Sequence, residues 1–364
     1  MFIYSFNYIL ILFGSIIFKN KNFNKYENIY WLLLLIYLYL FIGLRYEIGG
    51  DWEQYQYHFN FNSNLPLIEL SFELTGDIAY LLLVKISNFL NTNIIFVNLL
   101  SALIIIYCLK YFTEKSKNKF LALLTLYPYF IVVVILGYNR QGIAASIFLL
   151  SIIYFLERKF FLLLLSLFFA TMFHKSAIIC FLIFFLYPNN MNKEKIFFVG
   201  AILLSVISIL YFFIFYDSIN RGFFYFLYEP HFTSSGVYFR LLFYLLPVLI
   251  IFIFYNFLNF TKFENRLYVI TSILVIFSIP FSYYFSSFID RILVYFIFLQ
   301  PLIITKFYYN LSSNVSRVYF FLTVSLFYFF YMMIWFVFSD YSEWWVPYNF
   351  DINIFKYSTN IIKH

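Results

Sequence analysis

The sequence predicts an all-α, polytopic integral membrane protein with about 10–12 transmembrane helices and an active site on the periplasmic side. Two properties of its 364 residues carry this prediction: 64% are hydrophobic and 11% charged, and the mean hydropathy is +0.85. Such a chain is solvated mainly by lipid. Apolar runs of span length follow one another without a linker or an internal repeat, so we expect residues 1–364 to form a single transmembrane domain.

The apolar runs place the spans in order along the chain. Residues 1–18 hold no basic n-region and no small-residue cleavage site, so we expect an uncleaved first span rather than a signal peptide. A further apolar stretch, 160–187, is interrupted by His174 and Lys175. The uninterrupted runs are 3–18, 29–44, 94–112, 120–137, 141–156, 196–216, 238–258, 267–285, 291–309 and 318–338.

Basic residues indicate which connections face the cytoplasm, since Lys and Arg are enriched on that side of a membrane. Six connections together hold 15 of the 24 basic residues: 19–28, 110–119, 157–159, 189–195, 259–266 and 306–317. They share one side if 160–187 is a short hairpin or re-entrant pair with His174 and Lys175 at its tip, which we favour. If that stretch is instead one long tilted helix, every later loop changes side.

The hairpin topology leaves several segments and both chain ends outside. Residues 45–77 are then a long periplasmic loop, and residues 217–237 are a second one. Residues 78–91 are predicted to form an interfacial amphipathic helix, because their apolar positions recur at helical spacing.

Lysine and arginine are distributed differently between the two sides. The cytoplasmic connections hold 12 of 16 Lys but 3 of 8 Arg. Guanidinium groups bind phosphate oxygens bidentately, so arginines outside the membrane indicate an anionic substrate such as a lipid pyrophosphate. Alternatively they pair with carboxylates, because the same side holds 12 of 17 acidic residues. The arginines at or near external span ends are Arg45, Arg140, Arg221, Arg240 and Arg291.

The segment RYEIGGDWEQYQYHF, residues 45–59, follows the second span and contains candidate catalytic and sugar-binding residues. Its two glycines permit a tight or left-handed backbone that holds Asp51 close to a substrate. Asp51 is a candidate base for a sugar hydroxyl, and Trp52 and Tyr55 are candidates for stacking on sugar faces. The alternative is an interfacial aromatic belt around an Asp turn.

The segment YNRQGIAAS, residues 138–146, opens a span with Arg140 in its first turn and small residues behind it. Small residues let another helix or a lipid tail approach closely. The charge of Arg140 adds to the positive end of the helix dipole and to free backbone amides, which together make a phosphate site plausible. Its alternative role is topological anchoring.

His174 and Lys175, in FHKSA, interrupt apolar sequence on both sides. Ionisable residues at membrane depth are costly and usually mark a site or a water-filled cavity. His174 is a candidate for donating to a phosphate oxygen or exchanging a proton, and Lys175 for neutralising a leaving pyrophosphate. If the hairpin tip reaches the external interface, both are ordinary snorkelling residues.

Two later arginines, Arg240 and Arg291, repeat the pattern of an arginine at the external start of a span. Asp290, directly before Arg291, is consistent with a local charge pair. The tail SDYSEWWVPYNFD, residues 339–351, has the aromatic density of an interfacial segment and also of a sugar-stacking surface.

Several function classes lack sequence support. The chain has no phosphate-binding GxxxxGKS, no GxGxxG, no HExxH and no Cys/His cluster, so we expect neither a metal nor another cofactor. Cys108 and Cys180 lie far apart in apolar runs and support no disulfide. The net charge of +7 follows from topology, so no nucleic-acid partner is expected.

Five segments together resemble a known group in order and spacing. They are GGDWEQY after an Arg, YNRQGIAASIF, ERKFFLLLLSLFFATMFHKSAII, a late arginine at an external span start, and the aromatic WVPYNF tail. The chain resembles the EpsG-like, Wzy-type polysaccharide (O-antigen) polymerases over residues 30–350. The positions that match those recurring in that family are Arg45, Asp51, Arg140, His174, Lys175, Arg240 and Arg291.

The resemblance implies a membrane-embedded glycosyltransferase of the bacterial inner membrane. Such an enzyme moves a growing undecaprenyl-pyrophosphate-linked glycan onto the next lipid-linked repeat unit at the periplasmic face, for O-antigen, lipopolysaccharide or a related surface polysaccharide. It implies a flippase and a chain-length regulator as pathway partners. The mechanism it suggests is direct displacement, with arginines stabilising the departing lipid pyrophosphate and either Asp51 or His174 as the base.

Three other functions remain open from the sequence. An O-antigen ligase shares the external arginines and the lipid substrate, although the larger external domain expected of it is not evident. A flippase or other transporter predicts charges along a central cavity, whereas these mid-span stretches are nearly free of charge. A purely structural subunit leaves the external arginines unexplained.

Overall fold

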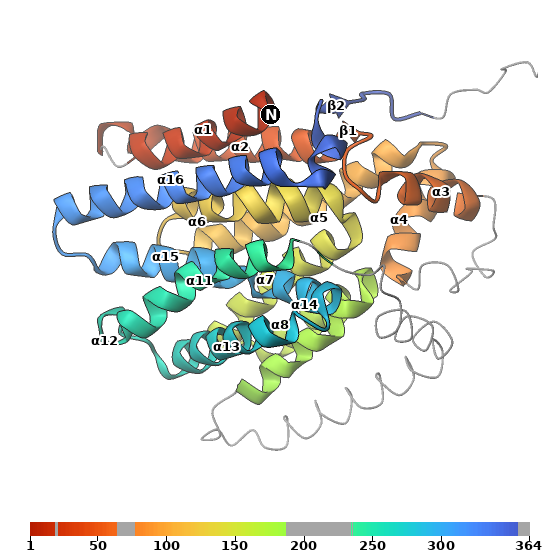
Figure 1. Cartoon of the computed structure of the whole chain (residues 1–364). Coiled ribbons are helices and arrows are strands. Elements are labelled where there is room, and N and C mark those ends of the chain that lie inside the picture. The colour runs from red at the N-terminus through yellow and green to blue at the C-terminus, as the bar shows by residue number, and fades with distance from the viewer. Residues whose placement is uncertain (19–20, 64–76, 187–233, 235, 356–364) are drawn as a thin grey trace, which may run out of the picture.

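The structure is a computed structural model that describes residues 1–18, 21–63, 77–186, 234 and 236–355. Within these residues nearly all of the chain is helical, and most helices lie in one bundle with similar directions (Figure 1). The all-α fold class is confirmed. The predicted span at 196–216, most of the predicted loop at 217–237, and Arg221 lie outside the described residues.

Every predicted uninterrupted apolar run apart from 196–216 coincides with helix. The long elements are α1 (Phe2–Ile17), α2 (Glu27–Gly43), α5 (Ile94–Lys115), α6 (Lys119–Leu126) continued by the π-helical η2 (Tyr127–Ile135), α7 (Asn139–Leu156), α8 (Phe160–Phe173), α11 (Val237–Ile253), α13 (Lys262–Phe281), α14 (Ser286–Leu293) continued by η4 (Val294–Phe298) and α15 (Leu299–Asn310), and α16 (Asn314–Phe338). The short elements are η1 (Lys21–Tyr26), α3 (Trp52–Ser63), α4 (Ile78–Phe89), η3 (Lys175–Leu186), α12 (Tyr255–Leu258) and η5 (Asp340–Trp345).

In the described part of the chain, five of these helical stretches are long and apolar enough to cross a membrane. They are Ile94–Lys115, Asn139–Leu156, Lys262–Phe281, Ser286–Asn310 and Asn314–Phe338. Shorter apolar helices, α1, α2 and α11 among them, pack beside them. The protein is therefore a multi-pass membrane protein.

Polar side chains set several helix starts. The side chains of Asn93 and Asn118 accept hydrogen bonds from backbone amides in the first turns of α5 and α6. Thr261 and Glu264 form a reciprocal capping box at the start of α13. This cap moves the start of α13 five residues before its apolar pattern, which explains the difference from the predicted 267–285.

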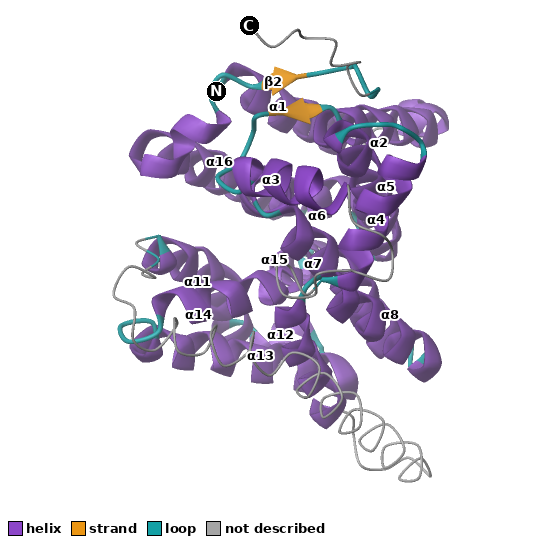
Figure 2. Cartoon of the chain, turned by 90° about the vertical axis from the view of Figure 1, so that its right-hand side faces the viewer, coloured by secondary structure: helices purple, strands orange, loops and turns teal. Residues whose placement is uncertain are grey.

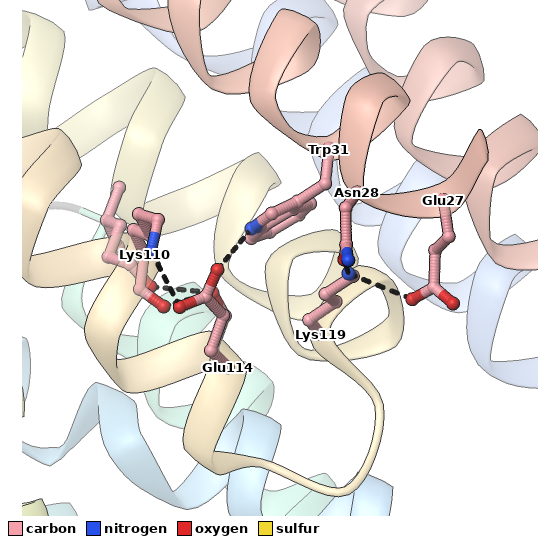
Figure 3. A network of polar contacts seen from close by, with 8 residues as sticks. Glu27, Asn28, Trp31, Lys110, Glu114 and Lys119 are labelled. Carbon is pink, nitrogen blue, oxygen red and sulfur yellow. Dashed lines mark hydrogen bonds and ion pairs between the residues drawn. The ribbon is translucent and has the colours of Figure 1, made fainter. Parts of the chain in front are cut away.

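The predicted cytoplasmic connections that the structure describes come together at one end of the bundle (Figure 1), whereas 189–195 lies outside the described residues. Figure 3 shows Lys119 between Glu27 and Asn28, and Glu114 between Lys110 and the Trp31 indole. Further contacts join the remaining described connections at this end: Lys115 and Lys159 with Glu157, Lys117 with Tyr309, Arg158 with Phe263, and Lys306 with Glu264. We call this the lysine-rich end.

The opposite end carries the two-stranded sheet, α3 and α4 (Figure 2). Strands β1 (Arg45–Tyr46) and β2 (Asn349–Phe350) pair antiparallel, with Arg45 opposite Phe350. The described part of the predicted loop 45–77 is thus a strand and a helix. The helix predicted at 78–91 is α4, and its location at a membrane interface stays a prediction.

The interrupted stretch 160–187 folds back on itself. Helix α8 ends at His174, whose backbone is extended (φ −156°, ψ 123°), and the chain continues as η3. Both α8 and η3 contact α7. Ile183 near the end of η3 shares an apolar groove with Phe148 in the middle of α7. This return agrees with the hairpin and not with one long tilted helix.

Candidate active site

A cavity of about 790 Å³ opens among α3, α7, α11, α14, η5 and the tip of the α8–η3 hairpin. It lies toward the end that carries β1, β2 and α3, away from the lysine-rich end (Figure 1). Seven of the nine residues predicted for the site line it: Asp51, Tyr55, Arg140, His174, Lys175, Arg240 and Arg291. The fold therefore gathers residues separated by up to 240 positions into one place.

Arg140 and Lys175 meet at one wall of the cavity through a shared carboxylate. Nη1 of Arg140 donates to Oδ2 of Asp77 at 3.0 Å, and the backbone N–H of Lys175 donates to Oδ1 of the same residue at 3.2 Å. Tyr55 lies below the guanidinium, with its ring centre 5.4 Å from Cζ of Arg140. Burial raises the pKa of Asp77 to about 6, although Arg140 and Lys175 favour its charged form.

Arg240 and Asp290 form a second ion pair at another part of the lining. Nη2 of Arg240 donates to Oδ2 of Asp290 at 2.7 Å, and the hydroxyl of Ser234 donates to the same oxygen at 3.1 Å. Asp290 interacts electrostatically with its neighbour Arg291, as the sequence suggested, but its hydrogen-bonded ion pair is with Arg240. Consecutive residues of a helix do not face each other, so Asp290 reaches α11 instead.

Arg291 lies on α14, where it also lines the cavity. Its backbone carbonyl accepts a hydrogen bond from Nε2 of Gln141 at 2.9 Å. Gln141 directly follows Arg140 on α7. This bond ties the first turn of α7 to α14, so the backbones that carry Arg140 and Arg291 are joined.

His174 is held at the hairpin tip by its neighbour. The backbone N–H of Ser176 donates to Nδ1 of His174 at 3.2 Å, and the Ser176 hydroxyl lies 2.8 Å from the hydroxyl of Tyr295. Nδ1 also lies 2.6 Å from the Ser176 hydroxyl oxygen. With Nδ1 as the acceptor of the backbone N–H, the neutral imidazole carries its proton on Nε2. His174 then offers a hydrogen-bond donor to a ligand in the cavity.

Asp51 occupies the turn between β1 and α3. Gly49 has a φ of +100°, and a Cβ there would lie 2.5 Å from the carbonyl oxygen of Leu136. Gly50 has open space around the same position. One of the two glycines is therefore required by the turn. Burial raises the pKa of Asp51, while Arg140 and Arg291 lower it in part.

Two predicted site residues lie elsewhere, since the described lining of the cavity includes neither Arg45 nor Trp52. Arg45 is 2% exposed, and its Nη1 donates to the backbone carbonyl of Ile42 at 2.6 Å. Trp52 is 8% exposed and packs edge-to-face on Tyr46 with ring centres 5.4 Å apart. Their predicted contacts with pyrophosphate and sugar would need both side chains to leave these packed positions.

Other lining residues were not singled out from the sequence, Asp77 above all. An acidic residue directly before an apolar helix is typical of an N-cap, but Asp77 makes no capping hydrogen bond. Further polar and aromatic lining residues are Gln54, Tyr129, Tyr138, Gln141, Trp335, Asp340 and Tyr341. The aromatic tail gave a signal for Tyr341, and Gln54 lies in the segment 45–59 although no role was predicted for it, whereas nothing in the sequence distinguished Tyr129.

Within the described residues, no group of three or more His, Cys, Asp or Glu side chains is placed to hold a metal ion. Cys108 and Cys180 are buried and free. The described lining of the cavity carries arginine and lysine side chains, carboxylates, one imidazole and aromatic rings.

Comparison with known proteins identifies the family. No curated protein and no solved structure matches the chain. A family model described as the EpsG family matches residues 28–350, which include every described residue of the cavity lining. The chain belongs to the EpsG family.

Proposed function

We propose that this protein polymerises undecaprenyl-pyrophosphate-linked oligosaccharide repeat units by glycosyl transfer at the periplasmic face of the bacterial inner membrane. Membership of the EpsG family supports a polymerase-like role in polysaccharide synthesis. The product would be O-antigen or a related surface polysaccharide. The partners would be the lipid-linked donor and acceptor glycans, membrane lipid, and the flippase and chain-length regulator of the pathway.

The observation that carries the proposal is the gathering of Arg140, Lys175, Arg240 and Arg291 around one cavity. A guanidinium group has five N–H donors, so an arginine held by one aspartate keeps further donors for phosphate oxygens. Developing negative charge on a leaving pyrophosphate is stabilised most by such preorganised cations. A cavity of about 790 Å³ can hold a pyrophosphate together with adjoining sugar rings.

The reaction would be a direct displacement. The hydroxyl oxygen of the acceptor sugar forms a bond to the anomeric carbon of the donor glycan. The bond from that carbon to the lipid pyrophosphate breaks, and its electron pair leaves with the pyrophosphate oxygen. The carboxylate of Asp51 takes the hydroxyl proton.

The hydrogen bonds around His174 favour Asp51 as the base. Nδ1 of His174 already accepts the Ser176 backbone N–H, which leaves Nε2 as a donor. In this role His174 would bind a pyrophosphate oxygen. Tyr55, Tyr138 and Tyr341 line the cavity and would stack against sugar rings, in place of the buried Trp52.

The test is to delete the gene and restore it as wild type or as Arg140→Ala, then to examine the cell's polysaccharide and lipid-linked intermediates on a gel. We expect Arg140→Ala to leave a single capped repeat in place of long chains, with the polymer measured per molecule of protein in the membrane. Arg317→Ala, at the lysine-rich end, is the matched control and should restore long chains.

Other outcomes would reject the proposal. Accumulation of unattached lipid-linked polymer in the deletion strain would identify a ligase. Accumulation of single repeats that have not crossed the membrane would identify a flippase.

A further inference from the structure

Asp77 is the carboxylate on which three parts of the site converge. It directly precedes α4, and its side chain is 3% exposed. One oxygen binds the side chain of Arg140 from α7, and the other binds the backbone of Lys175 at the hairpin tip. Asp77 thereby joins segments that are distant in the sequence, since Arg140 lies 63 positions and Lys175 98 positions after it.

Asp77 is poorly placed to act as the base, because both of its oxygens are engaged by hydrogen-bond donors of the protein. Its contacts instead fix the positions of two cationic residues. The backbone bond to Lys175 sets where the hairpin tip stands, and the bond to Nη1 sets the direction of the Arg140 guanidinium. A residue that binds a ligand-contacting side chain from behind fixes the orientation in which that side chain meets the ligand.

Arg140 remains able to bind an anion while Asp77 holds it. Its ion pair with Asp77 is made by one nitrogen, Nη1. Tyr55 contacts it as well, since the Tyr55 hydroxyl accepts from the Arg140 backbone N–H at 3.4 Å and the Tyr55 ring centre lies 5.4 Å from Cζ. With these contacts in place the arginine still lines the cavity.

We propose that Asp77 is a positioning residue, which holds Arg140 and the Lys175 backbone so that both cations face one pyrophosphate group. This inference rests on the proposed function. A purely structural ion pair is the alternative, and the chain offers a comparison for it. Lys306 and Glu264 form a part-buried ion pair of 2.6 Å at the lysine-rich end, far from the cavity.

The experiment uses the full-length protein with Asp77→Asn, which keeps the shape of the side chain and removes its charge. Polymer formation in the complemented deletion strain should fall about 100-fold, the effect of a displacement near 1 Å in a positioned group. Binding of inorganic pyrophosphate to the solubilised variant should weaken, since Arg140 and Lys175 are no longer held to face one anion together. Glu264→Gln, the control, should change neither quantity.

Polymer formation by Asp77→Asn at the wild-type level would overturn the proposal. A second variant, Asp77→Glu, separates charge from position because it keeps the carboxylate and lengthens the side chain by one CH₂. A normal protein level with about tenfold less polymer would support positioning. Wild-type polymer from Asp77→Glu, or loss of both variants from the membrane, would favour a merely structural charge pair.

Failure of this inference is distinguishable from failure of the proposed function. If the protein is not a polymerase, the deletion strain will accumulate unattached lipid-linked polymer or untranslocated single repeats instead of a single capped repeat. If only the role of Asp77 is wrong, the deletion strain will hold the single capped repeat, and the Asp77 variants will restore long chains as well as the wild-type gene does.

Discussion

At the scale of single residues, burial separates arginines that look alike in the sequence. Arg45 and Arg140 both stand near a span end that is predicted to be external, against the usual distribution of basic residues. Arg140 lines the cavity, whereas Arg45 is buried outside the described lining and bonded to the last turn of α2. The same sequence signal therefore marks one candidate ligand and one packed side chain.

This difference predicts distinct effects of replacing each arginine. Arg45→Met should lower the amount of folded protein in the membrane, because the carbonyl of Ile42 loses its donor at a cost of about 1–3 kcal/mol. Polymer formed per molecule of protein should stay unchanged. Arg140→Ala should abolish long chains per molecule of protein, in addition to the stability lost when the buried Asp77 carboxylate loses its partner. Quantitative immunoblots of membranes beside the polysaccharide gel measure both quantities.

If Arg45→Met instead abolishes polymer at a normal protein level, Arg45 acts on the substrate. The side chain would then have to leave the position described here. Arg45→Lys provides a comparison, because it keeps the charge and loses the forked geometry.

The site residues could be predicted where the signal was a charge in an unfavourable place. Arg140, His174, Lys175 and Arg291 were found in this way, since ionisable groups next to apolar runs demand an explanation. Asp77 was missed because its partners lie 63 and 98 residues away, and one sequence gives no register between such distant segments. The pairing of Asp290 with Arg240 was missed for the same reason.

At the scale of elements, the turn between β1 and α3 depends on close backbone approach. The backbone N–H of Gly49 donates to the carbonyl of Trp344 at 3.0 Å, so this turn also contacts the C-terminal segment. A Cβ on Gly49 would meet backbone on its other side, at Leu136. Asp51 thus owes its position to three segments that meet at one glycine.

Gly49→Ala should therefore be destabilising and should reduce polymer formation. The left-handed conformation costs a non-glycine residue about 1–3 kcal/mol, and the contact with Leu136 adds to this. Gly50→Ala is the matched control, because open space surrounds that position and a small loss is expected. The midpoint of thermal unfolding in detergent measures the difference. Equal midpoints for the two variants would contradict the role given to Gly49.

Helix positions were predictable from apolar length, but their breaks and caps were less so. Helices α5 and α16 follow their apolar runs closely. The two-residue strands β1 and β2 are too short for a period-2 pattern, and more than 300 residues separate them. Their pairing, like the π-helical turn at Tyr127–Ile135, arises from tertiary packing that local sequence does not encode.

At the scale of the whole molecule, the two ends of the bundle differ in chemistry. The lysine-rich end holds short connections whose lysines pair with Glu27, Glu114, Glu157 and Glu264 (Figure 3). The other end holds the cavity and its arginines. Because lysine in short loops is enriched on the cytoplasmic side, this asymmetry predicts that the cavity opens toward the periplasm.

Cysteine labelling tests this orientation directly. Asn60 on α3 and Lys117 at the lysine-rich end are both exposed, whereas the two native cysteines are buried. In intact spheroplasts, a membrane-impermeant maleimide should label Asn60→Cys and leave Lys117→Cys unmodified. Permeabilised membranes should label both variants, which controls for reactivity. The reverse labelling pattern would place the cavity and its arginines on the cytoplasmic side of the membrane. The lipid-linked repeat units on that side have not yet been translocated. Polymerisation at the periplasmic face would then be untenable.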